Sequence, residues 1–225
     1  MKVEVFKIWV QYIEAMENNI NIVRQAYNAI ADRYDSDLSD YEIRYFLQFF
    51  DNFEGKSVID LGCGQGRIAE YCYEKKGLDV LGCDISERML EIATKKNKYP
   101  QNISFILSDM QTIELEKQFD VAIASFSFIH LTNAQVSKSL INLRKLLKDD
   151  GHIFISLLLG NMCGYVNEPL DSNVKIFVKQ YTSSEITDLL ASSGYCITGI
   201  HYGEDNDIAA LSKEAIFIFA RKEGK

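Results

Sequence analysis

Short apolar runs alternate with helical patterns through the central part of the chain. Most of these runs lack the strict alternation of apolar and polar residues that marks a strand with one exposed face. They are typical of parallel strands that helices cover on both sides. The predicted strands are 57–61, 79–83, 103–107, 119–125 and 151–158, and the predicted helices between them are 66–76, 86–97 and 133–147. Repeated strand–helix units of this kind predict a doubly wound α/β sheet with right-handed crossovers.

Local capping signals set several of these boundaries. Ser86 stands where an N-cap would begin the helix at 86–97, and Thr182 can cap a further helix at 183–193 that Gly194 ends. The sequence Asp-Asp-Gly at 149–151 predicts a stop and a turn before the fifth strand.

The two ends of the chain depart from the alternation. Apolar residues recur at helical spacing over 3–17 and 20–34, and 41–50 is a further helical pattern rich in aromatic residues. Near the C-terminus, strands at 195–202 and 214–221 follow one another without a convincing helix between them, which indicates an antiparallel final strand. The apolar face of 3–17 has two interpretations, packing on the body of the protein or a homodimer contact.

Residues 159–181 form the longest stretch without a clear pattern. Long connections inside a compact domain are usually functional. This one leaves the carboxyl end of the fifth predicted strand, so it emerges at the edge of the sheet where open α/β proteins bind ligands. We expect it to form a wall of a substrate pocket.

Composition narrows the class of protein. The 225 residues carry a formal charge of −8, which argues against broad electrostatic attraction to nucleic acid. The five cysteines include no Cys-x-x-Cys pair, the three histidines are widely separated, and no apolar run reaches transmembrane length. We therefore expect a soluble, cytoplasmic protein with reduced thiols and no metal.

A glycine-rich turn after the first strand carries the main chemical signal. Asp60 ends the apolar run, and three alternate glycines then lead straight into a helical pattern: Gly62, Gly64 and Gly66. The second strand ends in Asp84, whose carboxylate can accept hydrogen bonds from both hydroxyls of a ribose. Strand ends of a parallel sheet share one edge, so the two signals together predict a nucleoside site.

The glycine spacing separates possible nucleosides. A dinucleotide site requires Gly-x-Gly-x-x-Gly, but Arg67 occupies the position of the third glycine, and no Gly-x-x-x-x-Gly-Lys loop is present. Asp60 would repel phosphates, whereas a carboxylate attracts an ammonium or sulfonium group. These residues resemble the first motif of class I S-adenosylmethionine-dependent methyltransferases.

The resemblance extends from about residue 26 to the end of the chain. It implies a Rossmann-like, seven-stranded, mostly parallel sheet with an antiparallel final strand. It also implies a helical lid over 1–40 and an S-adenosylmethionine-binding methyltransferase domain over 41–225, with 159–181 as an insertion at the substrate pocket.

The resemblance implies roles for individual residues in cofactor binding. Asp60 corresponds to the acid that holds the methionine end, and Asp84 to the ribose ligand. Asp109 corresponds to the acid that accepts a hydrogen bond from the exocyclic amine of adenine. The backbone carbonyl of Ser125 would face the cofactor's ammonium group. The other expected contacts are the turn residues and apolar or aromatic covers: Gly62, Cys63, Gly64, Gly66, Ile85, Met110, Tyr27 and Tyr34.

Structural alternatives exist for several of these residues. Packing alone explains Gly66, Ile85 and the two tyrosines equally well. Asp109 could instead cap a helix over 111–115, and Asp84 could be a helix cap.

His130 is the candidate catalytic residue. It follows the fourth strand on the rim where an acceptor would bind, and imidazole can remove a proton near neutral pH. The alternative is a structural histidine hydrogen-bonded to neighbouring loops. Methyl transfer itself depends mainly on alignment of nucleophile, methyl carbon and sulfur.

The acceptor class is inferred from motifs that the chain lacks. The fourth strand is followed by Ser-Phe-Ser-Phe rather than by the Asn/Asp-Pro-Pro run of amino-methylating nucleic-acid enzymes. The only prolines are Pro100 and Pro169, so no Pro-Cys nucleophile exists. We expect methyl transfer to an oxygen or nitrogen of a small molecule, leaving S-adenosylhomocysteine. The alternatives are a methyltransferase acting on RNA or protein, a non-catalytic S-adenosylmethionine-binding protein and, least favoured, a nicotinamide oxidoreductase.

Overall fold

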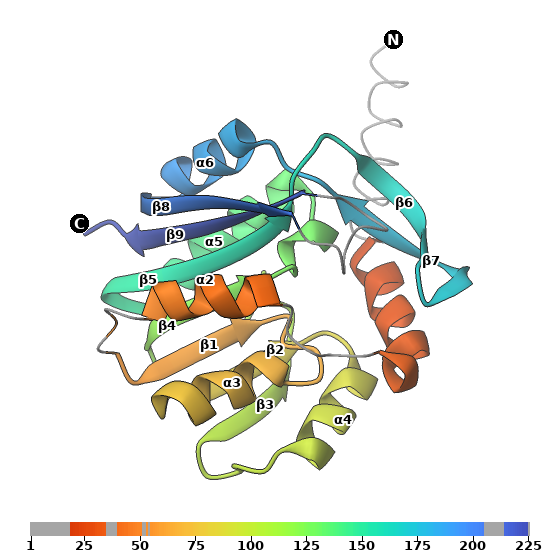
Figure 1. The fold of residues 1–225 in the computed structure, drawn as a ribbon, viewed down its shortest axis with the longest axis horizontal. Coiled ribbons are helices and arrows are strands. Elements are labelled where there is room, and N and C mark those ends of the chain that lie inside the picture. Colours follow the sequence, from red (N-terminus) through yellow and green to blue (C-terminus); the bar gives the residue numbers. More distant parts are fainter. Residues whose placement is uncertain (1–18, 35–39, 51–52, 54, 205–213, 225) are drawn as a thin grey trace.

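A seven-stranded sheet forms the centre of the molecule (Figure 1). The structure is a computed structural model and describes residues 19–34, 40–50, 53, 55–204 and 214–224. The strands lie in the order β3-β2-β1-β4-β5-β9-β8, and only β9 runs antiparallel to its neighbours. Their bounds are β1 Ser57–Leu61, β2 Asp79–Asp84, β3 Ile103–Leu107, β4 Phe119–Ser125, β5 Leu147–Leu158, β8 Tyr195–Glu204 and β9 Glu214–Lys222. This topology confirms the predicted fold class.

Helices cover both faces of the sheet. One buried cluster packs α5 and α6 against it, and a second packs α2 and α3 against the other face. A helix over 19–30 runs into the 3-10 turn η1 and lies outside these layers (Figure 1). The helical elements are η1 Ala31–Arg33, α2 Asp40–Phe50, α3 Arg67–Lys76, α4 Glu87–Lys96, η2 Phe128–His130, α5 Asn133–Leu146 and α6 Ser183–Ser192.

The helices begin at the capping residues that the sequence indicated. Ser86 Oγ accepts a hydrogen bond from the backbone N–H of Met89, and Thr182 accepts one from Glu185. Gly194 follows α6 with φ +77°, a conformation that glycine adopts without strain. These boundaries depend on contacts within one turn, which is why sequence alone identifies them.

Strand β5 begins earlier than the predicted strand at 151–158. Strand β5 already begins at Leu147, which pairs with Phe119, and the register shifts between Phe119 and Val121. Asp150 has φ +60°, so the Asp-Asp-Gly sequence makes a local irregularity inside the strand. The start of the strand was not predicted because these residues are polar. A sequence pattern reports the polarity of side chains, whereas a strand is defined by its backbone pairing.

The segment without a clear sequence pattern forms an antiparallel hairpin. Strands β6, Cys163–Glu168, and β7, Asp171–Lys179, pair with one another in a separate two-stranded sheet. The hairpin lies beside the helix at 19–30 (Figure 1), and the Arg33 guanidinium makes a 2.7 Å ion pair with Asp171. Only β7 carries a run of buried residues, which explains the weak signal.

The predicted helix at 3–17 lies outside the described residues. None of the helices that the structure describes combines the length and apolar composition that a bilayer crossing requires.

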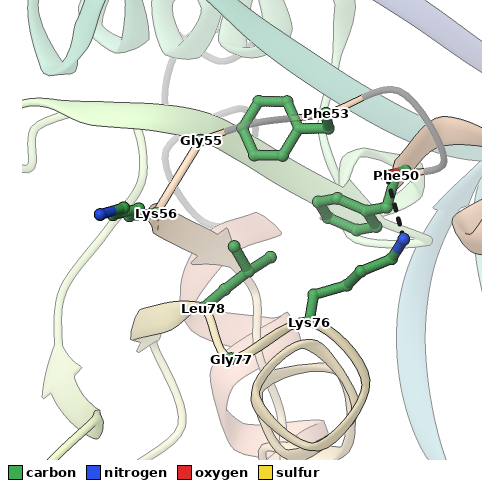
Figure 2. A pocket seen from close by; sticks show the side chains of 7 residues that line it. All are labelled: Phe50, Phe53, Gly55, Lys56, Lys76, Gly77 and Leu78. Atoms are coloured by element: carbon green, nitrogen blue, oxygen red, sulfur yellow. Dashed lines mark hydrogen bonds between the residues drawn. The ribbon is translucent and has the colours of Figure 1, made fainter.

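A pocket of about 460 Å³ opens at the amino ends of β1 and β2 (Figure 2). Leu78 and Lys56 line it just before these strands begin, and Lys76 Nζ donates a 3.1 Å hydrogen bond to the carbonyl of Phe50. The pocket therefore lies at the opposite end of the strands from the glycine turn and contains none of the predicted site residues.

Candidate cofactor and acceptor site

The glycine turn is held against the end of the neighbouring strand. The backbone N–H groups of Gly62 and Cys63 both donate to the carbonyl of Cys83, at 2.8 and 3.0 Å. Gly62, Gly64 and Gly66 have φ of +73°, +53° and +81°, a region that other residues enter only with strain. The turn then ends at the first residue of α3. Its position at the switch between β1 and β4 is where open α/β sheets bind ligands.

The three glycines have different surroundings. A Cβ on Gly62 would lie 2.6 Å from Ser127 Cβ, and one on Gly66 would lie 2.5 Å from the ring of Phe105. A Cβ on Gly64 would meet no described atom within 4 Å. Gly62 and Gly66 are therefore required by packing, whereas Gly64 borders open space at the turn.

Asp84 is a buried carboxylate that organises the turn. Its Oδ2 accepts a 2.8 Å hydrogen bond from the N–H of Gly64, and its Oδ1 accepts one of 2.8 Å from Ser86. Burial raises the pKa of Asp84, and these backbone hydrogen bonds act in the opposite direction. Each carboxylate oxygen keeps a lone pair for a further donor, as a ribose would supply.

Asp109 lies next to Asp84 at the same edge of the sheet. The N–H of Ser108 donates to the carbonyl of Asp84, which continues the pairing of β2 with β3. Asp109 Oδ1 accepts a 2.8 Å hydrogen bond from the N–H of Gln111, so it closes a local turn. The helix considered over 111–115 is absent from this described segment.

Apolar side chains flank the two acids. Ile85 and Met110 are partly buried and pack against the core, and Met110 Cε lies 3.6 Å from the Cβ position of Gly62. Cys63 is buried, and burial raises its thiol pKa well above the ordinary value. This thiol therefore contributes as a small apolar group.

The end of β4 brings two serines to the turn. Ser125 Oγ lies 2.7 Å from Ser156 Oγ on β5, and Phe126 follows with φ +46°. Ser127 Oγ is buried and has no hydrogen-bond partner among the described residues. Asp60 is also buried, with 1% of its surface exposed. Ser127 was not among the predicted contacts, because its proximity to Gly62 arises only from folding.

His130 and Tyr27 meet above this edge. The Tyr27 hydroxyl lies 2.6 Å from His130 Nε2, and His130 Nδ1 lies 2.7 Å from the carbonyl of Phe177. A carbonyl only accepts, so Nδ1 carries the proton and Nε2 accepts from the tyrosine. Burial lowers the pKa of His130 to about 4. The imidazole is therefore neutral at neutral pH, with both nitrogens engaged by the protein.

The helix at 19–30 is fastened along its length. Asn19 exchanges side-chain hydrogen bonds with Gln135, and Asn28 bonds Ser86 and Glu87 at the start of α4. Beyond the helix, Gln65 Nε2 donates to the carbonyl of Ala31 at 2.8 Å. Tyr27 and Tyr34 pack edge to face with their ring centroids 5.9 Å apart. The N-terminal segment thus contacts the glycine turn at Gln65, the start of α4 and His130.

Residues 58–151 match the family model described as a methyltransferase domain. This segment of the chain is therefore a methyltransferase domain. The seven-stranded sheet and the N-terminal helix of the chain agree with this assignment.

Known proteins similar to this methyltransferase domain differ in length and substrate. Phosphoethanolamine N-methyltransferase of Triticum aestivum is 24% identical over 191 residues, covering 84% of this chain and 36% of that one. Ubiquinone biosynthesis O-methyltransferase of Coxiella burnetii is 29% identical over 163 residues, covering 66% and 68%. The chain thus spans about a third of the first relative and about two thirds of the second.

Solved structures support the fold. Magnesium protoporphyrin IX methyltransferase from Synechocystis with bound S-adenosylmethionine superposes with a TM-score of 0.68 at 18% identity, covering 91% of this chain and 97% of the other. The open space at Gly64 and the unsatisfied hydroxyl of Ser127 fit such a ligand. Among the described residues, no group of three or more metal-ligating side chains is placed to hold an ion.

Proposed function

We propose that this chain transfers the methyl group of S-adenosylmethionine to an oxygen or nitrogen of a small molecule, leaving S-adenosylhomocysteine. One observation carries the proposal: the Cβ-free Gly64 and the buried Asp84 share a hydrogen bond at a rim that Tyr27 and His130 cover. The relatives named above act on small molecules and include both O- and N-methyltransferases.

The proposed cofactor contacts follow the edge of the sheet. Asp84 would accept from the ribose hydroxyls, and Asp109 would accept from the adenine amine between Ile85 and Met110. Asp60, the Ser125 carbonyl and Ser127 Oγ would surround the ammonium end. The sulfonium supplies an already activated methyl group, so the protein's main work is alignment and exclusion of water.

Tyr27 and His130 would act together on the acceptor side. The neutral imidazole of His130 accepts a hydrogen bond at Nε2 from the Tyr27 hydroxyl, and the two rings pack edge to face. The pair therefore offers polar atoms next to an aromatic surface. A hydroxyl acceptor that replaces or joins this contact would pass its proton toward His130 as the new bond to carbon forms. An amine acceptor would instead be oriented by the same pair.

The test combines binding with turnover. We expect calorimetry to show binding of S-adenosylhomocysteine, and Asp84→Ala to weaken it at least about tenfold, or 1.4 kcal/mol, through lost ribose hydrogen bonds. Mass spectrometry of a metabolite extract incubated with enzyme and deuterium-labelled cofactor should reveal a labelled product. Unchanged affinity in the variant would refute the ribose role. Cofactor binding without any labelled small molecule would favour a macromolecular acceptor or a non-catalytic role.

We also propose a cytoplasmic setting, no nucleic-acid partner and a homodimer through the N-terminal residues. The charge of −8 and the five free cysteines support the first two. The third is supported by the apolar pattern of 3–17, and light scattering of the protein with and without these residues would test it.

A further inference from the structure

Glu168 is a buried carboxylate at the end of β6. Only 7% of its surface is exposed. Its Oε2 accepts hydrogen bonds from the N–H groups of Leu170 at 2.6 Å and Asp171 at 3.0 Å, which closes the hairpin turn. Within the described part of the chain, no hydrogen bond engages Oε1. Closing the turn therefore uses one oxygen of the group and leaves the other available.

No lysine or arginine of the described residues forms an ion pair with Glu168. Two cations of this region pair with other acids, Arg33 with Asp171 and Lys179 with Glu185, and Lys175 on β7 is exposed. Burying a carboxylate without a cation is costly, and two backbone N–H groups offset that cost only in part. A neutral glutamine would close the same turn, because its Oε1 can accept the same two hydrogen bonds. The turn alone does not explain a charged residue at this position.

The position of Glu168 relates it to the reaction side of the site. Burial chiefly raises the pKa of Tyr27, Tyr34 and the charges of Asp84 and Glu168 raise it further, and Arg67 lowers it. Both carboxylates therefore lie within electrostatic range of the Tyr27 hydroxyl. That hydroxyl contacts His130, and His130 contacts the carbonyl of Phe177 on the same hairpin. Glu168 thus lies on the hairpin that contacts this pair.

Apolar side chains on the hairpin add a second property. Val166 and Val174 are partly buried and pack against the core beside Ile176. The hairpin therefore combines apolar side chains with one buried carboxylate. Such a surface favours a molecule that has an apolar body and a cationic group.

We infer that Glu168 binds a cationic nitrogen of the acceptor through Oε1, so that the substrate class is organic amines. This inference rests on the proposed methyltransferase function and specifies its acceptor. The bound cation would supply the charge partner that Glu168 lacks among the described residues. Glu168 is here a specificity-determining residue and takes no part in methyl transfer.

Three matched probes test the charge preference: benzylammonium, benzyl alcohol and benzoate. Each is titrated by NMR into the full chain saturated with S-adenosylhomocysteine. We expect benzylammonium to bind at least about tenfold more tightly than benzyl alcohol, and benzoate to bind most weakly. Glu168→Gln should abolish the preference. Glu116→Gln, which removes an exposed charge from the β3–β4 connection, should preserve it.

The outcomes separate this inference from the proposed function. Equal binding of the three probes, no binding of the cation, or a preference that survives in Glu168→Gln would overturn the inference. Thermal unfolding and S-adenosylhomocysteine affinity should be unchanged in Glu168→Gln, which excludes misfolding as the cause of a lost preference. Failure of the native chain to bind S-adenosylhomocysteine would contradict the proposed function instead.

Discussion

The glycines of the turn are required for different reasons, Gly66 by close packing and Gly64 by the open space beside it. Gly66 is enclosed by Phe105 and Ala93, whereas Gly64 has open space where its side chain would be. Both have left-handed backbone conformations. The same glycine-to-alanine change therefore separates a role in packing from a role in ligand approach.

Gly66→Ala should destabilise the protein more than Gly64→Ala. Each variant incurs about 1–2 kcal/mol of backbone strain, and the contact with Phe105 adds about 1–3 kcal/mol at position 66. Urea unfolding measures both. Gly64→Ala should in addition lose most of its affinity for S-adenosylhomocysteine while remaining folded. Equal stability of the two variants would show that Phe105 moves aside freely.

Ser127→Ala should weaken cofactor binding without destabilising the free protein. The hydroxyl is buried and has no partner among the described residues, so its removal leaves no group unsatisfied. We expect about a tenfold loss of affinity for S-adenosylhomocysteine in calorimetry. Affinity for 5′-methylthioadenosine, which lacks the amino-acid half, should be unchanged. A parallel loss for both ligands would place Ser127 away from the ammonium end.

His130 should make stability depend on pH. The folded pKa of about 4 lies below the ordinary value of 6.5, so the unfolded chain binds the proton more readily. The stability that neutral His130 contributes is complete above pH 6.5 and is lost as pH falls toward 4, by up to about 3 kcal/mol. Urea unfolding from pH 7 to 4 should show the advantage of the native chain over His130→Asn shrinking. A constant difference would contradict the buried, neutral histidine.

At the scale of elements, the helix over 19–30 connects parts of the site that are distant in sequence. Arg24 and Asn28 both reach Glu87 on α4, but Asn28 also bonds Ser86 and the backbone N–H of Arg88. The Arg24 ion pair is long and roughly half exposed, and such pairs contribute about 0–1 kcal/mol.

Asn28→Ala should therefore speed the release of cofactor, and Arg24→Ala should not. Three hydrogen bonds at the start of α4 are lost with Asn28, at a cost of about 1–3 kcal/mol in docking the helix. Stopped-flow dissociation of S-adenosylhomocysteine should show about a tenfold faster rate in Asn28→Ala. Identical rates in both variants would mean that the helix does not retain the ligand.

Elements were predictable where their signals are local. The strand β1, the caps Ser86 and Thr182 and the acid at the end of β2 depend on near neighbours, so the sequence indicated them and the cofactor class. The bond between Tyr27 and His130 joins residues separated by 103 positions, and no periodicity reports such a contact. The β6–β7 hairpin was not predicted for a related reason: strand β6 is mostly exposed and carries few apolar residues.

For the whole molecule, the order of the strands places every candidate ligand contact along one edge. The acids Asp60, Asp84 and Asp109 come from β1 or from the ends of β2 and β3, and β4 delivers the serines and His130. The hairpin and the N-terminal segment at 19–34 border that same edge, and the ion pair between Arg33 of η1 and Asp171 links them. The opposite end of the sheet carries a separate pocket and none of these groups (Figure 2).

The fastening of one helix to both sides of this edge has a kinetic consequence. A ligand that enters beneath this helix must first break hydrogen bonds that also hold His130, Gln65 and Ser86 in place. We therefore expect an ordered mechanism, in which S-adenosylmethionine binds before the acceptor and S-adenosylhomocysteine is the last product to leave. At saturating substrate, movement of the helix at 19–30, rather than the chemical step, would then limit the turnover rate.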